Sequence, residues 1–218
     1  MSSIARPYEP KASRSPAFVR LGSRFEQALA YVVAMHREQA RKDKPVPYLS
    51  HLLGVASIVL EFGGSEDQAI AGLLHDTIED CGAEHVPEIR ERFGEEVLLM
   101  VRACTDSEVP GGEDKSDWHE RKRAYLLHLS KLDPRDPALL VSASDKLHNA
   151  RAIVTDLRRD PSFLASFNGG TEGQLSYYET LSGIFEGLIP GALSDELRRT
   201  VEQMRPLASP VPPGVPSP

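Results

Sequence analysis

Signals that begin α-helices recur along residues 21–204 of this chain. Ser23-x-x-Glu26, Ser65-x-x-Gln68 and Thr171-x-x-Gln174 match the capping box, in which the first and fourth side chains bond to each other's backbone N–H groups. Asp136-Pro137 is typical of an N-cap followed by a proline in the first helical turn. No segment alternates apolar and polar residues over the length of a strand, and no internal repeat is evident. The pattern predicts an all-α fold.

The 218 residues suit a single domain with short tails. We expect a flexible arm at 1–20, one helical bundle at 21–204, and a disordered proline-rich tail at 205–218. The expected helices lie at about 23–42, 50–62, 65–82, 86–93, 95–105, 117–131, 136–159, from 171 onward, and 194–204.

Composition narrows the classes of protein that this chain can belong to. The net charge of −7 argues against general nucleic-acid binding, although it permits a small phosphorylated ligand beside local basic clusters. Cys81 and Cys104 form neither a disulfide framework nor a CxxC pair, which favours a reduced, cytoplasmic setting. The sequence contains no apolar run long enough for a membrane span or a signal core.

The segment Leu73-Leu74-His75-Asp76-Thr77-Ile78-Glu79-Asp80 concentrates an imidazole and three carboxylates. On one continuous helix, residues four apart are neighbours, so His75 would lie beside Glu79 and Asp76 beside Asp80. Like charges and desolvation both oppose ionisation of such a group. A bound divalent cation would remove that conflict.

Two residues elsewhere extend the candidate metal site. His51 follows a proline-marked entry and should lie near the start of a helix, whereas Asp145 falls inside an apolar helix and needs a partner there. With His75 and Asp76 they form a mixed nitrogen and oxygen set, which suits Mn²⁺, Fe²⁺ or Zn²⁺ better than Ca²⁺. Four protein ligands leave room for a water that the metal can activate.

These residues together resemble the H…HD…D pattern of the HD superfamily of metal-dependent phosphohydrolases. Arg41-Lys42, Pro47-Tyr48-Leu49-Ser50-His51, the His75–Asp80 segment and Asp145-Lys146-Leu147-His148-Asn149 are similar to the hydrolase domain of RelA/SpoT proteins. They are more similar still to the small alarmone hydrolases, which include the metazoan SpoT homologues. The resemblance covers about residues 23–190.

The resemblance implies an HD-type helical bundle and a role for each matching residue. It implies one Mn²⁺, with Fe²⁺ or Zn²⁺ as alternatives, bound by four ligands: His51, His75, Asp76 and Asp145. It assigns the positioning and deprotonation of the attacking water to Glu79 and Asp80. It implies a nucleotide substrate that is held by Arg41, Lys42, Asn149 and Tyr177, and we expect Lys122, in the basic run Arg121-Lys122-Arg123, to bind the leaving diphosphate. The implied reaction is hydrolysis of the 3′-diphosphate of (p)ppGpp, which yields GDP or GTP and pyrophosphate.

Other interpretations stay open at this point. The segment from Arg41 to His51 is one residue longer than in the long bifunctional enzymes, and Ala152 replaces their usual threonine. Both differences concern the nucleotide side, so NADPH, adenosine alarmones or nucleoside 5′-phosphates are alternative substrates. A non-catalytic nucleotide sensor is a third hypothesis, which the complete ligand set disfavours. We expect structural roles for His36, His148, Trp118 and Tyr125. The sequence does not address the oligomeric state.

Overall fold

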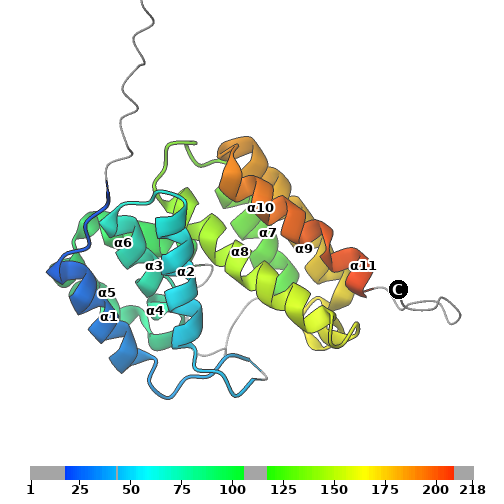
Figure 1. The fold of residues 1–218 in the computed structure, drawn as a ribbon, viewed down its shortest axis with the longest axis horizontal. Coiled ribbons are helices and arrows are strands. Elements are labelled where there is room, and N and C mark those ends of the chain that lie inside the picture. Colours follow the sequence, from blue (N-terminus) through cyan, green and yellow to red (C-terminus); the bar gives the residue numbers. More distant parts are fainter. Residues whose placement is uncertain (1–17, 43, 106–116, 209–218) are drawn as a thin grey trace, which may run out of the picture.

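The computed structural model describes residues 18–42, 44–105 and 117–208, and these residues form an array of helices (Figure 1). The first group of helices comprises α1 (Ser23–Met35), α2 (Leu49–Glu61), α3 (Glu66–Leu74), α4 (Thr77–Cys81), the 3₁₀ turn η1 (Ala83–His85), α5 (Val86–Phe93) and α6 (Glu95–Cys104). The second group comprises α7 (Trp118–Leu129), α8 (Ala138–Leu157), the 3₁₀ turn η3 (Phe163–Ser166), α9 (Gly170–Leu188), α10 (Ala192–Glu202) and α11 (Met204–Ala208).

The all-α prediction is confirmed, since the described residues contain no β-strand beyond one isolated bridge between Ala40 and Pro47. None of the described helices combines the length and the apolar content that a membrane crossing requires. The predicted arm at 1–20 and the tail from 205 fall largely on residues 1–17 and 209–218, which lie outside the described residues.

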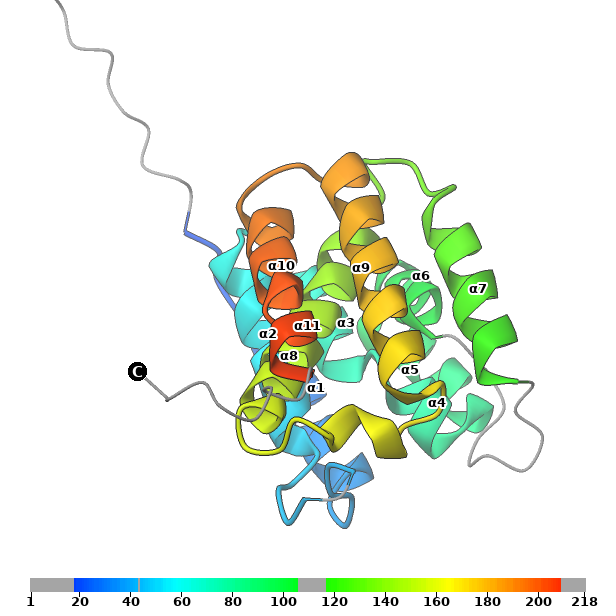
Figure 2. The same cartoon turned by 90° about the vertical axis from the view of Figure 1, so that its right-hand side faces the viewer.

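The long helix α8, a member of the second group, packs against the first group and contributes side chains to two apolar cores (Figures 1 and 2). Val141 of α8 packs into the core that α1, α2, α3, α5 and α6 share. Leu139, Ala143 and Leu147 pack into the core formed with α7, α9 and α10, and Ile58 of α2 joins them there. Because side chains on two faces of α8 are buried, the orientation of the helix about its own axis is fixed. Its polar side chains at 145 and 149 are thereby placed between the two cores.

Several predicted helix boundaries need correction. The helix expected at 23–42 ends at Met35, and the connection that follows contains Pro45 and Pro47, each of which disfavours helical geometry in the residue before it. Gly22, rather than Ser23, is the N-cap of α1, and Gly169 is that of α9, so only the Ser65 capping box is confirmed. At the other end, Met204 is buried, and the predicted tail begins too early because α11 continues to Ala208.

The most consequential correction concerns the helix expected at 65–82, which breaks at His75 and Asp76 into α3 and α4. Both residues keep backbone angles of the right-handed helical region, with φ −57° and ψ −30° at His75 and φ −98° and ψ −3° at Asp76, so the interruption is a local distortion. The backbone N–H of Asp80 still donates to the carbonyl of Asp76 at 2.8 Å, so the two pairs keep their spacing of four residues.

Candidate functional site

The four predicted metal ligands converge between α2, the α3–α4 break and α8. His51 Nε2 lies 3.4 Å from Asp76 Oδ2 and 3.2 Å from Asp145 Oδ1. His75 Nε2 lies 3.0 Å from Asp76 Oδ2 and 3.5 Å from Asp145 Oδ1. Three of the four residues, His51, His75 and Asp76, offer ligand atoms that all lie within 4.8 Å of one another. The arrangement suits one shared ion, which the donor atoms would surround.

Both imidazoles are oriented for metal binding through Nε2. His75 Nδ1 donates to the carbonyl of Gly72 at 2.9 Å, which leaves Nε2 facing the carboxylates. This buried nitrogen has no hydrogen-bond partner of acceptable geometry in the described part of the chain. His51 Nδ1 lies 2.9 Å from His148 Nδ1. A divalent cation would satisfy the orphaned nitrogen, so the residues present fit a metal.

The surroundings keep two candidate carboxylate ligands ionised, the buried Asp145 and the partly buried Asp76. Burial alone would raise the pKa of Asp145, but Lys146, whose Nζ lies 2.6 Å from Asp145 Oδ2, and the two histidines hold it well below its usual range. Burial likewise opposes ionisation of Asp76, yet His75 and His51 hold its pKa well below the usual value. The hydroxyl of Tyr48 donates to Asp76 Oδ2 at 2.5 Å. Sequence reasoning missed Tyr48 and Lys146 as partners of the ligands.

Glu79 and Asp80 take up different positions beside the ligands. Glu79 lines a cavity of about 270 Å³ that also exposes Asp76 and Asp145. Asp80 lies at the solvent edge, where Gln39 Nε2 donates to its Oδ2 at 2.8 Å. Partial burial and the charge of Asp76 raise the pKa of Asp80. The two carboxylates therefore do not share one environment, which allows them different tasks.

His36 connects to Asp80 through the side chain of Gln39. His36 Nδ1 lies 2.5 Å from Gln39 Oε1, and an N–H at this nitrogen would direct the amide NH₂ of Gln39 toward Asp80. The ring of His36 stacks on Tyr48 with centroids 5.5 Å apart. His36 is buried, as a hydrogen-bonded core histidine should be, but its bond links the core to the site.

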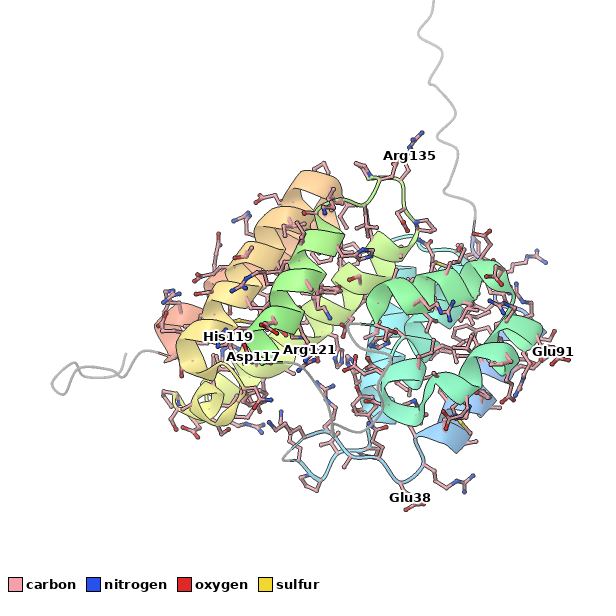
Figure 3. The ribbon with its side chains drawn as sticks, turned by 180° about the vertical axis from the view of Figure 1, so that it is seen from behind. Glu38, Glu91, Asp117, His119, Arg121 and Arg135 are labelled. Carbon is pink, nitrogen blue, oxygen red and sulfur yellow. The ribbon has the colours of Figure 1, made fainter. Side chains whose placement is uncertain are left out.

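Three basic side chains also line the 270 Å³ cavity. Lys122 and Arg121 of α7 line it together with Lys146. Figure 3 shows Arg121 beside Asp117 and His119 at the start of α7, which places these side chains apart from Arg135 in the connection to α8. A cavity lined both by two carboxylates of the candidate ligand set and by three cations suits a phosphorylated group.

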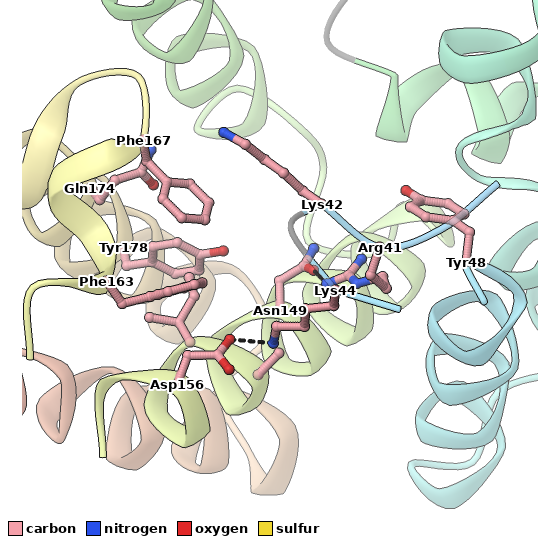
Figure 4. Close-up of a pocket in the computed structure, with 12 residues that line it drawn as sticks. Arg41, Lys42, Lys44, Tyr48, Asn149, Asp156, Phe163, Phe167, Gln174 and Tyr178 are labelled. Carbon is pink, nitrogen blue, oxygen red and sulfur yellow. Dashed lines mark hydrogen bonds and ion pairs between the residues drawn. The ribbon is translucent and has the colours of Figure 1, made fainter. Parts of the chain in front are cut away.

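A second cavity, of about 300 Å³, adjoins the first one through Tyr48 and Asn149, which line both. Figure 4 shows its basic and aromatic side chains facing one another. Its walls come from the α1–α2 connection, from α8, from η3 and the residue after it, and from α9. The lining residues are Arg41, Lys42, Lys44, Tyr48, Asn149, Ala152, Ile153, Asp156, Phe163, Phe167, Gln174 and Tyr178.

Three of the five residues expected to bind substrate meet in the second cavity. Arg41 Nη2 donates to Asn149 Oδ1 at 2.8 Å, and Asn149 Nδ2 donates to Asp145 Oδ1 at 2.6 Å, so the cavity is coupled to the metal ligands. Lys42 Nζ lies 4.5 Å from the centre of the Phe167 ring. Aromatic and cationic groups in this arrangement can hold the π-face of a base.

Tyr177 and Lys122, the other two residues expected to bind substrate, do not line the second cavity. Tyr177 is buried against α7, with Lys122 Nζ 5.2 Å from its ring centre, and Tyr178 lines the second cavity instead. Helical neighbours differ by about 100° in direction, so the two adjacent rings face different surroundings, and the role expected for Tyr177 stays a prediction. Trp118 and Tyr125 do pack as expected, Trp118 at 6.1 Å from Tyr177 between centroids and Tyr125 in the core.

Comparison with known proteins agrees with this geometry. The model of the HD domain family matches residues 28–163. The protein MESH1 of Xenopus tropicalis, named guanosine-3′,5′-bis(diphosphate) 3′-pyrophosphohydrolase, is 35% identical over 74% of this chain and 83% of its own length. Human MESH1, which carries the same name, is 33% identical over the same shares. The chain therefore belongs to the HD domain family and, within it, to the relatives of MESH1.

Solved structures agree on the fold. A metazoan orthologue of SpoT superposes with a TM-score of 0.66 over 86% of this chain and 99% of its own, at 24% identity. A Listeria monocytogenes protein superposes with a TM-score of 0.60 over 74% of this chain and 99% of its own, at 30% identity.

Proposed function

We propose that this protein hydrolyses the guanosine alarmones ppGpp and pppGpp at the 3′-diphosphate, giving GDP or GTP and pyrophosphate. The observation that carries the proposal is the continuity of two cavities. One exposes Asp76 and Asp145 of the candidate ligand set together with Glu79, and the other is lined by aromatic and cationic groups, with Tyr48 and Asn149 common to both. The names of the MESH1 relatives support the same reaction.

In this proposal His51, His75, Asp76 and Asp145 hold one Mn²⁺, with Fe²⁺ or Zn²⁺ as alternatives. A cation there would polarise the 3′-phosphate and lower the pKa of a water beside it. The convergent imidazole and carboxylate atoms support this role, because such mixed sets suit these ions. The proposed location is the cytoplasm, which agrees with the two free thiols of Cys81 and Cys104.

The acidic pair divides the work on the attacking water. Asp80, with its raised pKa and its Oδ2 bound to Gln39, has Oδ1 available to accept the proton. Glu79, on the cavity wall, orients the same water by accepting a hydrogen bond. The cations of the first cavity, Lys122 and Lys146 among them, offset the charge that develops on the leaving diphosphate. The nucleoside occupies the second cavity beside Arg41.

Release of pyrophosphate from ppGpp tests the proposal. The purified protein should release it with Mn²⁺ and stop when a chelator is added. Asp80→Asn should lower kcat by at least about 100-fold, which is the size of a general-base contribution. Asp67→Asn is a matched control. Asp67 lies on α3 away from the ligands, where it pairs with Arg24 of α1. No turnover of ppGpp by the intact protein would reject the function, and an active Asp80→Asn would reject the mechanism.

A further inference from the structure

The far end of the second cavity, away from the metal ligands, holds an ion pair whose function the reaction leaves unexplained. Lys44 Nζ and Asp156 Oδ2 are in contact, with Lys44 arriving from the α1–α2 connection and Asp156 from α8 (Figure 4). Asp156 is only 8% exposed, and both side chains line the cavity. A carboxylate accepts about four hydrogen bonds, so one ammonium does not saturate it.

One face of α8 connects this ion pair to the metal ligands. Asp145, Asn149, Ala152 and Asp156 are spaced by four, three and four residues, which places them in one row along the helix. The row spans about 17 Å at the helical rise per residue. Its order is metal ligand, polar amide, small side chain, carboxylate. A nucleotide with its 3′-phosphate at the metal would extend past Asn149 and point its base toward Asp156.

Aromatic rings flank the space between Ala152 and the ion pair. Phe163, Phe167 and Tyr178 line it, and Lys44 Nζ lies 5.7 Å from the ring centre of Phe163. Rings of this kind stack on any base, because every base has a π-face. The walls therefore hold a base without choosing between purines, and the choice must come from groups that meet the base edge.

An ammonium beside a carboxylate matches the edge of guanine and not that of adenine. Guanine presents an acceptor, O6, next to two donors, N1–H and N2–H. Adenine presents a donor at N6 next to an unprotonated N1, whose lone pair would face the carboxylate. A site built to hydrogen-bond a substrate rejects the analogue that leaves its buried polar groups unpaired.

We propose that Lys44 and Asp156 select guanine, with the ammonium of Lys44 donating to O6 and the carboxylate of Asp156 accepting from N1–H and N2–H. The inference rests on the proposed function and assigns its base specificity to two residues outside the catalytic group. If the ion pair only stabilised the contact between the α1–α2 connection and α8, its loss would change kcat/KM for all substrates alike. If it binds the base edge, its loss changes the ratio of kcat/KM between guanosine and adenosine substrates.

The test compares the 5′-diphosphate 3′-diphosphates of guanosine, inosine and adenosine as substrates, with pyrophosphate release as the readout. The intact protein should prefer guanosine to inosine, which lacks the 2-amino group, and inosine to adenosine. Asp156→Asn should lower kcat/KM for guanosine about 10- to 100-fold, which corresponds to the loss of hydrogen bonds to a charged acceptor, and should leave adenosine unchanged or improved. Lys44→Met, which keeps the aliphatic stem, should impair guanosine and inosine but not adenosine.

Glu196→Gln is the matched control, because Glu196 forms another ion pair with α8, through Arg151, outside the cavity. It should keep the base preference of the intact protein. The ratio of two kcat/KM values from one preparation does not depend on the folded fraction, so partial misfolding of a variant does not obscure the result. A guanosine-to-adenosine ratio that stays unchanged in both Asp156→Asn and Lys44→Met overturns the inference. Failure of the intact protein on every substrate would instead reject the proposed function.

Discussion

Replacement of Gly54 by alanine should disturb the metal centre through a residue that does not touch the metal. A Cβ at position 54 of α2 would lie 2.3 Å from both Cδ2 and Nε2 of His148. Ordinary contact between such atoms begins near 3.5 Å, so the ring must retreat by about 1 Å. A shift of that size is enough to break the 2.9 Å contact between His148 Nδ1 and His51 Nδ1.

The consequence follows from the tautomer of His51. Its Nε2 can bind a metal only if Nδ1 carries the proton, and His148 Nδ1 accepts that proton's hydrogen bond. Loss of such a partner typically weakens metal binding or activity about 10- to 100-fold. Overpacking should also destabilise the metal-free protein by about 1–3 kcal/mol, against a gain of up to about 1 kcal/mol from the higher helix propensity of alanine.

Calorimetric titration with Mn²⁺ and thermal unfolding of the metal-free protein measure the two effects separately. Gly187→Ala is the matched control, because Gly187 lies on the exposed face of α9 and an added Cβ meets nothing within 4 Å. We expect the control to bind Mn²⁺ normally and to be slightly more stable. Native metal affinity and native stability in Gly54→Ala would refute the coupling between Gly54, His148 and His51.

Three further predictions address the acid, the metal and the pH dependence. Gln39→Ala should lower kcat about 10-fold without changing KM, because Asp80 loses the bond that orients it; initial rates of pyrophosphate release measure this. Saturating Mn²⁺ should raise the unfolding temperature, by an amount that corresponds to about 4 kcal/mol at a thousandfold excess over Kd, because only the folded chain brings the four ligands together; calorimetric scans with and without chelator measure it. Burial, together with His51 and Arg41, lowers the pKa of His148 to about 4, so the unfolded chain binds the extra proton first and the metal-free protein should lose stability as pH falls from about 6.5 to 4. Denaturant unfolding of the intact protein and of His148→Gln across that range isolates this contribution.

Each prediction has an outcome that contradicts it. A fall in kcat that is matched by a change in Mn²⁺ affinity would show that Gln39 acts on the metal ligands and not on Asp80. An unfolding temperature that is indifferent to Mn²⁺ would count against a metal site in the folded protein. Parallel stability curves for the intact protein and His148→Gln would mean that another group titrates in that window.

Local sequence signals were sufficient for the helical class, and they singled out the candidate metal ligands. The capping box at Ser65 and Gln68 forms as predicted, because both partners lie within one helical turn. Asp145 stands out as a candidate ligand for a related reason, since an aspartate in an apolar stretch requires a partner to be stable there. The interruption between α3 and α4 carries no such signal, because neither His75 nor Asp76 is a helix-breaking residue such as proline or glycine.

The sequence by itself indicated the helical class and a set of candidate metal ligands, because residue types and short spacings carry those signals, and its resemblance to the alarmone hydrolases implied a role for Glu79 and Asp80 on the water. Only the tertiary structure decided how the nucleotide side is built. Lys44, Asp156 and Phe163 come from separate segments, and none carries a local signal that distinguishes it from a solvated charge or a packing ring. Their meaning arises when α8, buried on two faces between two cores, brings the α1–α2 connection and the start of α9 to one cavity.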